Sequence, residues 1–254
     1  IMLAQQRKQH LLAVLAADGR IVAKEAASAI GTSEDTIRRD LRALAGEGLL
    51  QRVHGGALPA SKAIKDLKAR GGISIDEKRA IGLAAAKLIE PGLVVFIDGG
   101  TTTTQLVRSL NPNLRATVVT HSPTIAVELV DHAVDVQVIG GRLFKHSMVS
   151  VGSEALDAIR SVRADNYFMG VTGVHPETGL TTGDAEEARI KRAMAECSGD
   201  VTVLVSPEKL GSASPFVIGD CNLITRMIVL NTAQSSPLKQ FKKQGVDIVF
   251  AQMT

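Results

Sequence analysis

Aromatic residues are scarce in this sequence. Its 254 residues include no Trp, one Tyr and six Phe, so that aromatic side chains make up only 3% of the chain. Proteins that bind single-stranded nucleic acid without sequence preference stack the bases on exposed aromatic rings. The composition therefore argues against that class of protein.

Long apolar runs and cysteine clusters are missing too. No stretch approaches the roughly 18 consecutive apolar residues of a membrane-spanning helix, and the first residues lack the apolar segment of a secretory signal. Cys197 and Cys221 have neither CxxC spacing nor a nearby cluster of His. We expect a cytoplasmic protein with reduced, structural thiols and with neither a metal site nor a cofactor.

Positive charge is concentrated in the first third of the chain. The net charge is +3, but residues 1–90 hold 15 Lys and Arg against 10 Asp and Glu, whereas the rest of the chain holds 14 against 16. This asymmetry is typical of a nucleic-acid-binding part joined to a neutral domain. We predict a first domain over residues 1–60, a basic, glycine-containing linker over 61–75, and a second domain over 76–254.

The first domain reads as three helices and a hairpin. Helices are predicted near residues 7–20, 21–31 and 32–46, and the alternating stretch "LLQRVHGGAL" (49–58) predicts a small β-hairpin. Such an order is typical of a helix-turn-helix with a wing, in which the third helix enters the major groove of DNA. We expect the hairpin to carry Arg52 and His54 to the DNA.

The third predicted helix has an apolar face and a cationic face. Ile37, Leu41 and Leu44 share one side, and the opposite side carries its three arginines, Arg38, Arg39 and Arg42. Arginine's planar fork binds guanine edges and phosphate oxygens. The alternative is an ordinary helical hairpin whose arginines are neutralised by Glu34, Asp40 and Glu47.

From residue 93 onward, apolar strands alternate with helices. Strands are predicted at 93–98, 116–120, 134–141, 166–171, 201–206, 223–230 and 246–251, and helices at 76–92, 101–110, 122–130, 185–197 and 235–244. Near-continuous apolar strands separated by helices predict an α/β domain with a mostly parallel sheet that is covered on both faces.

The first loop of this domain, Asp98 to Thr103, favours an anion. Gly99 and Gly100 let backbone N–H groups approach a ligand, and Thr101, Thr102 and Thr103 add hydroxyls at a helix N-terminus. The spacing matches neither a Walker A loop nor a dinucleotide fingerprint. The alternative is a tight turn that merely caps the helix.

Other polar residues follow later strands, and the carboxyl ends of parallel strands meet at one edge of a sheet. We therefore expect a single pocket. Its candidate residues, beside those of the first loop, are His121, Ser122, Gly141, Arg142, Thr172, Gly173, Asp184, Glu187, Lys191 and Lys209. Glu187 and Lys191 are four residues apart, and taken alone they predict an ion pair on a helix surface.

"SEDTIRRDLRALAGEGLLQRVHGGA" (33–57) resembles the N-terminal signature of the DeoR family of bacterial sugar-metabolism repressors. The resemblance implies a winged helix-turn-helix whose Ser33, Thr36, Arg38 and Arg39 read operator DNA. Residues 76–229 resemble the family's effector domain, whose fold is similar to sugar-phosphate isomerases and deaminases.

For the second domain the resemblance implies a phosphorylated sugar as ligand. Residues 98–103 would cradle its phosphate, and the side chains that would contact its hydroxyls or order the pocket are Asp184, Glu187, Lys191 and Lys209. This chain departs from the family pattern in having His121 for Asn, and Thr172 and Ser206 where Asp is common. Fewer carboxylates imply either an atypical ligand or a lower affinity.

The expected function is that of a repressor, not an enzyme. It would bind double-stranded operator DNA as a homodimer or homotetramer, make no membrane contact, and leave the DNA when the sugar phosphate binds. One alternative is a sugar-phosphate isomerase or deaminase with an accessory DNA-binding domain. Another is an architectural DNA binder with a second domain that holds no ligand.

Overall fold

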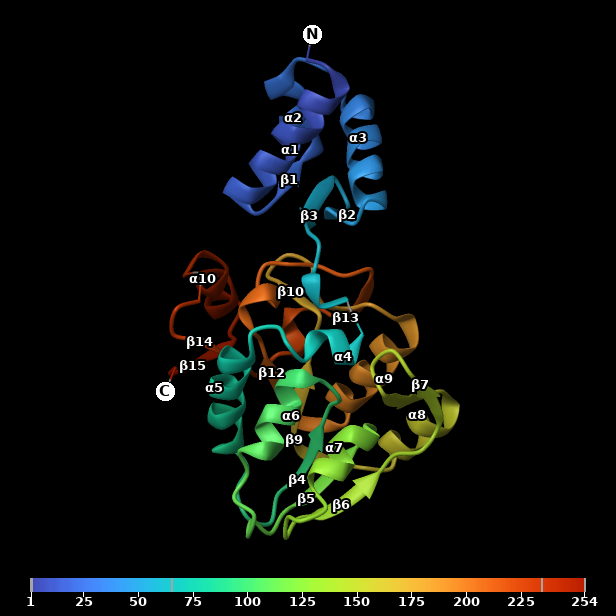
Figure 1. The fold of residues 1–254 in the computed structure, drawn as a ribbon, viewed down its shortest axis with the longest axis vertical. Helices are drawn as coiled ribbons and strands as arrows, with labels where there is room; N and C mark the ends of the chain where they lie inside the picture. The colour runs from blue at the N-terminus through green and yellow to red at the C-terminus, as the bar shows by residue number, and fades with distance from the viewer. Residues whose placement is uncertain (1, 65, 234, 254) are drawn as a thin grey trace.

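The computed structural model describes residues 2–64, 66–233 and 235–253. A small domain lies at one end of an elongated molecule, and strand β3 leads from it into a larger domain (Figure 1). Within the described ranges no helix combines the length and the apolar character needed to cross a membrane.

The small domain is a three-helix unit with a wing. Its elements are α1 (Ala4–Asp18), β1 (Ile21–Val22), α2 (Ala23–Ile30), α3 (Glu34–Gly46), β2 (Leu50–Val53) and β3 (Gly56–Pro59). Leu11 and Leu15 of α1 pack against Ile37, Leu41 and Leu44 of α3 in one apolar core. The predicted helices and hairpin are thus present, and the apolar face of α3 is the buried one.

The helix predicted over residues 21–31 begins two residues late. Ile21 and Val22 form the short strand β1, which pairs with Ala57 and Gly56 of β3 in a three-stranded sheet of order β1-β3-β2. A two-residue strand is too short to produce a recognisable alternation of apolar and polar residues, so its pairing depends on the hairpin that follows later in the chain.

The segment predicted to be a linker is folded onto the larger domain. It contains η1 (Lys62–Ile64) and α4 (Leu67–Arg70). The Ser61 N–H donates to the Ala213 carbonyl at 3.1 Å, and the Leu67 N–H donates to the His146 carbonyl at 2.9 Å. Residues that connect the two domains therefore also form part of the surface of the second one.

The larger domain is built on a seven-stranded sheet of order β15-β14-β12-β9-β4-β5-β6, in which all neighbours are parallel. This confirms the predicted α/β class. The strands are β4 (Val94–Ile97), β5 (Thr117–Thr120), β6 (Asp135–Val138), β9 (Ala164–Gly170), β12 (Ser198–Leu204), β14 (Arg226–Leu230) and β15 (Asp247–Ala251).

Helices cover both faces of this sheet (Figure 1). On one face lie α5 (Ile75–Ala86), α6 (Thr101–Arg108) and α7 (Pro123–Glu128), and on the other lie α8 (Ser153–Arg160), α9 (Ala185–Glu196) and α10 (Ser235–Lys243). The alternation along β4 produces the two cores, because Phe96 packs with the second group of helices while Val95 and Ile97 pack with the first.

Two smaller sheets were not predicted from the sequence. A hairpin joins β7 (Arg142–Phe144) to β8 (Val149–Val151), and an antiparallel sheet contains β10 (Gly173–His175), β11 (Gly179–Thr182) and β13 (Phe216–Gly219). The short helices η2 (Pro207–Lys209) and η3 (Cys221–Leu223) lie on either side of β13 in the sequence. These additions supply part of the walls of the site described below, among them Phe144, Thr182 and Lys209.

Candidate functional site

Helix α3 presents its arginines to solvent. The Arg38 and Arg39 side chains are 56% and 73% exposed, and Arg42 is exposed on the same helix. Arg38 pairs with Glu34 at 2.6 Å and Arg39 with Asp35 at 3.4 Å, one helical turn earlier. Exposed ion pairs of this kind contribute only about 0–1 kcal/mol to the free energy of unfolding. DNA phosphates could therefore replace the carboxylates as partners of the arginines at little cost in free energy.

The other two acids of the helical-hairpin alternative have different partners. Asp40 is buried and binds the Arg7 guanidinium of α1, and Glu47 lies 3.6 Å from Lys8 of the same helix. These contacts hold α3 against α1. Asp40 and Glu47 therefore do not neutralise the exposed arginines of α3.

The remaining predicted DNA contacts lie near the start of α3 and on the wing. Ser33 caps α3, since its Oγ accepts from the Thr36 N–H at 3.2 Å, and its hydroxyl lies 2.9 Å from that of Thr36. Arg52 on β2 and His54 in the hairpin turn are exposed. All seven predicted residues therefore lie on α3, its cap or the wing.

In the larger domain, the loop between β4 and α6 forms a small cup. The cavity is lined by Arg70, Gly99, Gly100, Thr101, Thr102, Thr103, Gly170, Val171, Thr172, Thr182, Glu187, Lys191 and Lys209. Gly99 is required because a Cβ there would lie 2.4 Å from the Val149 side chain, and Gly100 adopts a φ of +152° that side chains disfavour. The sequence-predicted loop thus meets Lys191 and Lys209 from distant parts of the chain.

The cup threonines differ in what their hydroxyls can do. Thr103 is fully buried and donates to the Gly100 carbonyl at 3.0 Å, so its hydroxyl holds the start of α6 together. The Thr102 hydroxyl lies 3.4 Å from Lys209 Nζ. Of the three predicted threonine donors, Thr103 has a structural role.

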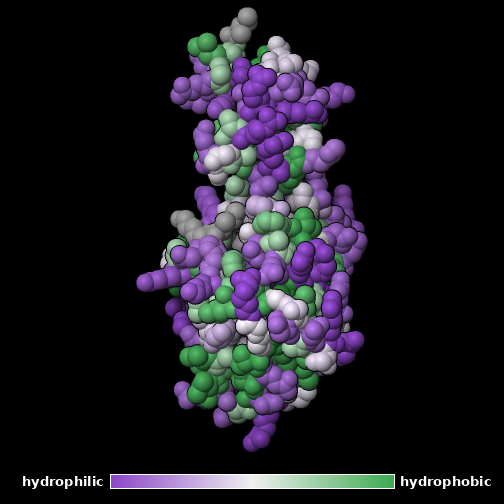
Figure 2. Space-filling view, turned by 90° about the vertical axis from the view of Figure 1, so that its right-hand side faces the viewer, coloured by the Kyte–Doolittle hydropathy of each residue, from purple (hydrophilic) through white to green (hydrophobic). Residues whose placement is uncertain are grey.

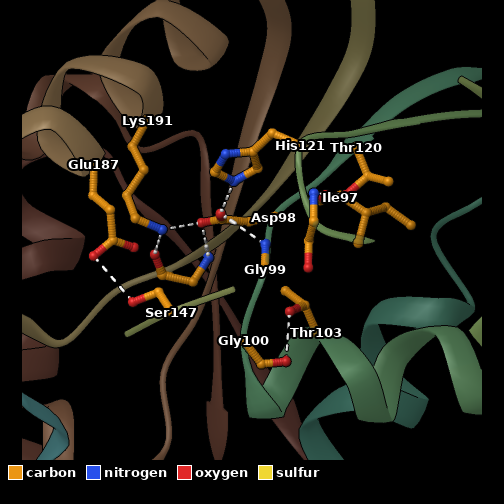
Figure 3. Close-up of polar contacts among 12 residues, drawn as sticks. Ile97, Asp98, Gly99, Gly100, Thr103, Thr120, His121, Ser147, Glu187 and Lys191 are labelled. Atoms are coloured by element: carbon orange, nitrogen blue, oxygen red, sulfur yellow. Dashed lines mark hydrogen bonds and ion pairs between the residues drawn. The ribbon is translucent and has the colours of Figure 1, made fainter. Parts of the chain in front are cut away.

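Asp98 lies beneath the cup, at the end of β4, and is fully buried (Figure 3). Its Oδ1 accepts from the Gly99 N–H at 2.8 Å and from His121 Nε2 at 2.8 Å. Its Oδ2 accepts from Lys191 Nζ, the Tyr167 hydroxyl and the Gly170 N–H. A carboxylate so enclosed orders the cup and has no surface left for a ligand.

Burial and neighbouring charges together set the pKa values of Asp98 and Lys209. Burial alone would raise the pKa of Asp98, but the Lys191 ammonium and the hydrogen bond from His121 hold that pKa well below its ordinary value. Burial lowers the pKa of Lys209 to about 7, and the neighbouring cations Lys78, Arg70 and Lys191 act in the same direction. Lys191 is thus committed to Asp98, whereas Lys209 can gain or lose its charge near neutral pH.

His121 and Ser122 support the β7–β8 hairpin. The His121 Nδ1 lies 3.1 Å from the Ser150 carbonyl oxygen, and the Ser150 N–H donates to the His121 carbonyl at 2.7 Å. Ser122 Oγ donates to the Met148 carbonyl at 3.3 Å. Both residues are fully buried, so they position the hairpin next to the cup and do not line it.

The hairpin closes a second cavity, of about 220 Å³, that adjoins the cup. It is lined by Ala63, Arg70, Phe144, His146, Ser147, Thr172, Gly183, Asp184 and Glu187. Arg70, Thr172 and Glu187 line both spaces. In it the Ser147 hydroxyl donates to Glu187 Oε2 at 3.1 Å (Figure 3).

Comparison with known proteins identifies the family. The model of the DeoR C-terminal sensor domain matches residues 73–230, and that of the DeoR-like helix-turn-helix domain matches residues 7–63. The chain belongs to the DeoR family of transcriptional regulators. The resemblance inferred from the α3 signature is thereby confirmed.

Curated DeoR-family relatives align over nearly the whole chain. The HTH-type transcriptional regulator GlpR of Haloferax volcanii is 32% identical over 251 residues, covering 98% of each chain. The glycerol-3-phosphate regulon repressor of Escherichia coli K12 is 30% identical over 221 residues, covering 86% of this chain and 88% of that one. These relatives are named as regulators, so the chain belongs with transcription factors and not with enzymes.

A solved structure of ribose 5-phosphate isomerase A from Methanocaldococcus jannaschii matches with a TM-score of 0.40 and 18% identity, over 53% of this chain and 54% of that chain. The family is established by sequence alone.

Besides Asp98, His121 and Ser122, three further candidates of this DeoR-family chain fall outside the cavities. Gly141, Arg142 and Gly173 are absent from the described residues that line the cup or the second cavity. Arg142 is exposed and pairs with Glu186. Gly173 lies in β10, where a Cβ would come within 2.7 Å of the Ser212 carbonyl oxygen, so its role is close packing between strands.

The surface ion pair predicted for Glu187 and Lys191 is wrong. Both side chains are buried on α9, where Lys191 binds Asp98 and Glu187 accepts from Ser147. Residues four apart on a helix share a face, but here that face is turned toward the sheet and the cavities, so each side chain meets a different partner.

Both hydroxyls at the positions where the DeoR family commonly has Asp are engaged within the protein. The Thr172 hydroxyl lies 2.6 Å from that of Ser214, and the Ser206 hydroxyl donates to Glu208 at 2.8 Å. The carboxylates beside the second cavity come instead from Asp184 and Glu187. Asp184 caps α9, because its Oδ1 accepts from the N–H groups of Glu186 and Glu187.

Sequence reasoning missed several lining residues. Arg70 lay within the predicted linker, and Phe144, His146 and Ser147 lay in a stretch for which no hairpin was predicted. A basic residue in a polar segment gives no signal that it will fold over a cavity. The glycine-rich "GGRLFKHSM" (140–148), which follows a predicted strand, was the one available hint.

Proposed function

We propose that this DeoR-family regulator represses a carbohydrate-metabolism operon and that a phosphorylated sugar bound in the larger domain changes its affinity for operator DNA. The carrying observation is the cup itself, which joins a glycine-rich helix N-terminus to three cationic side chains, Arg70, Lys191 and Lys209. Backbone N–H groups and cations together favour a phosphate.

The DNA-binding half of the proposal depends on α3. Arg38, Arg39 and Arg42 would contact phosphates and base edges from the major groove, with Ser33 and Thr36 at the start of the helix, and Arg52 and His54 would reach the backbone or minor groove from the wing. Neutralised phosphates release counterions, so log K should fall linearly with log salt. A flat dependence would contradict this half.

In the sensing half, the phosphate occupies the cup formed by Gly99 to Thr102. Lys209 and Arg70 would supply positive charge, while Asp98 and Lys191 keep the loop in place. The sugar would extend toward Asp184 and Glu187, whose carboxylate oxygens can accept hydrogen bonds from hydroxyl groups.

The segment between the domains offers a route for coupling. Ser61 donates its hydroxyl to the Thr172 carbonyl at the cavity wall, and the Ala213 N–H donates to the Pro59 carbonyl at the end of β3, at 3.1 Å. Arg70, eleven residues after the wing strand, lines the cavities directly. A ligand that draws Arg70 or Thr172 inward would shift the segment on which the DNA-binding domain is mounted.

Assembly into a homodimer or homotetramer is part of the proposal. Strand β6 is at the sheet edge, and near it Val127, Val130 and Val138 are 71%, 75% and 54% exposed. In Figure 2 hydrophobic residues gather on the part of the larger domain that lies away from the DNA-binding domain. An apolar patch beside an unpaired strand suits contact with a second copy. Because operator DNA is in the cytoplasm of a bacterial or archaeal cell, we expect the protein there.

The test is a titration of DNA from the protein's own operon region, with and without a panel of sugar phosphates. We expect at least one of them to weaken operator binding markedly. If none of them changes it, the sensing half of the proposal is wrong while the DNA-binding half stands.

A further inference from the structure

The cup and the second cavity differ in size. The cup encloses only about 20 Å³, whereas the adjoining cavity encloses about 220 Å³. A phosphate group in the cup would therefore leave the rest of the ligand in the second cavity. That space is smaller than the roughly 300–1,000 Å³ of sites that hold drug-sized ligands, which points to a single sugar unit.

The two spaces also differ in charge, and this difference sets the direction of the ligand. The cup is lined by three cations, Arg70, Lys191 and Lys209, and by one carboxylate, Glu187, whereas the second cavity is lined by one cation, Arg70, and by two carboxylates, Asp184 and Glu187. Carboxylates repel a phosphate and accept hydrogen bonds from hydroxyls. The ligand thus enters the cup with its phosphate and points its hydroxyl groups toward α9.

The β7–β8 hairpin supplies an apolar wall to the second cavity. Phe144 is partly buried against the core that contains Phe96, and the centre of its ring lies 5.8 Å from that of the His146 ring. Ser147, buried beside it, fixes the Glu187 carboxylate. Contact with the C–H groups of a sugar would remove apolar surface of the Phe144 ring from water.

From these observations we infer that the hairpin selects ligand length: the site takes monophosphates of five- or six-carbon sugars in preference to three-carbon phosphate esters, and Phe144 is the residue that makes the distinction. A three-carbon ester with its phosphate in the cup fills only part of the second cavity and leaves the Phe144 ring without contact. This inference rests on the proposed function, because it assumes that the cup binds phosphate.

The experiment is a calorimetric titration of the full-length protein with inorganic phosphate, glycerol 3-phosphate, and a panel of aldose and ketose monophosphates with five or six carbons. We expect the best sugar phosphate to bind at least tenfold more tightly than glycerol 3-phosphate. In Phe144→Ala this advantage should fall severalfold, while binding of inorganic phosphate and glycerol 3-phosphate is unchanged.

Leu143→Ala is the matched control, because Leu143 neighbours Phe144 on β7 but is exposed and does not line the cavity. It should bind every probe like the natural protein. The inference is overturned if glycerol 3-phosphate binds as tightly as the best longer ester, or if Phe144→Ala weakens all probes by the same factor. If no probe binds at all, including inorganic phosphate, the proposed function itself fails.

Discussion

The molecule has two groups of cationic side chains that differ in their surroundings. Arg38 and Arg39 on α3 are exposed and have single carboxylate partners one helical turn away. Lys191 and Lys209 in the larger domain are buried, and Lys191 is tied to a buried aspartate. Exposed cations suit a large polyanion that approaches from outside, whereas Lys209, which is buried beside the cup, would suit a small anion that enters it.

The comparison predicts that replacing a buried cation destabilises the fold far more than replacing an exposed one, and this is the largest effect we expect. Lys191→Met leaves the Asp98 carboxylate buried without its ammonium and should lower the free energy of unfolding by about 3–5 kcal/mol. Arg38→Met removes only an exposed pair and should change it by less than about 1 kcal/mol. Urea unfolding of both variants measures the contrast, and similar losses would show that the two groups do not differ as described.

For the affinity for operator DNA, we expect the exposed arginines of α3 to matter more than the buried lysines of the larger domain. Arg39→Ala should weaken binding to operator DNA by about 1–3 kcal/mol, because in the proposed function its guanidinium contacts base edges or phosphates. Fluorescence anisotropy measures this change. Arg79→Ala is the control, since Arg79 is similarly exposed and paired at one turn with Asp76, but lies on α5 of the larger domain. Normal operator binding by Arg39→Ala would remove Arg39 from the set of DNA contacts.

The lowered pKa of Lys209 predicts that the affinity for the ligand depends on pH. With its pKa lowered to about 7, the amino group is charged below that pH and neutral above it. A phosphate in the cup binds the charged form, so the free protein must take up a proton at higher pH. Between pH 7 and 9, where a phosphate ester is already a dianion, the affinity for the ligand should fall by up to about tenfold per pH unit.

Lys209→Arg is the variant that tests this origin. Its guanidinium stays protonated throughout the range, so calorimetric titrations should give a nearly constant affinity. An equal pH dependence in the two proteins would assign the effect to another group.

The smallest expected effect concerns the segment between the domains. Ser61→Ala removes the hydroxyl bonded to the Thr172 carbonyl, and should reduce the influence of ligand on operator binding by about 0.5–2 kcal/mol. The separate affinities for ligand and for operator should change little. Ser161→Ala, whose hydroxyl bonds only to the nearby Ala158 carbonyl among the described residues, serves as control. If coupling is retained in Ser61→Ala, the route through Ser61 is wrong.

Periodicity and local motifs predicted much of this molecule. The apolar face of α3 and the buried strand before Asp98 are recorded in neighbouring residues, so they can be predicted directly from the sequence. The glycine-threonine loop was likewise recognisable because its residues are consecutive.

What could not be predicted depends on contacts between distant residues. Asp98 looked like a ligand contact, but four residues from later parts of the chain enclose it. Arg70 looked like a linker residue, but α4 folds over the cavity beside the β7–β8 hairpin. In each case the side chain's role is set by partners from 23 to 93 residues away, such as His121 and Lys191 for Asp98, and local pattern carries no record of them.

The central claim is that the α3 surface and the cup are coupled, and coupling must be reciprocal. The most direct measurement is the affinity of the best-binding sugar phosphate for the free protein and for the protein saturated with operator DNA. We predict weaker binding to the DNA complex, by the same factor by which the sugar phosphate weakens operator binding. Equal affinities in the two states would contradict the account.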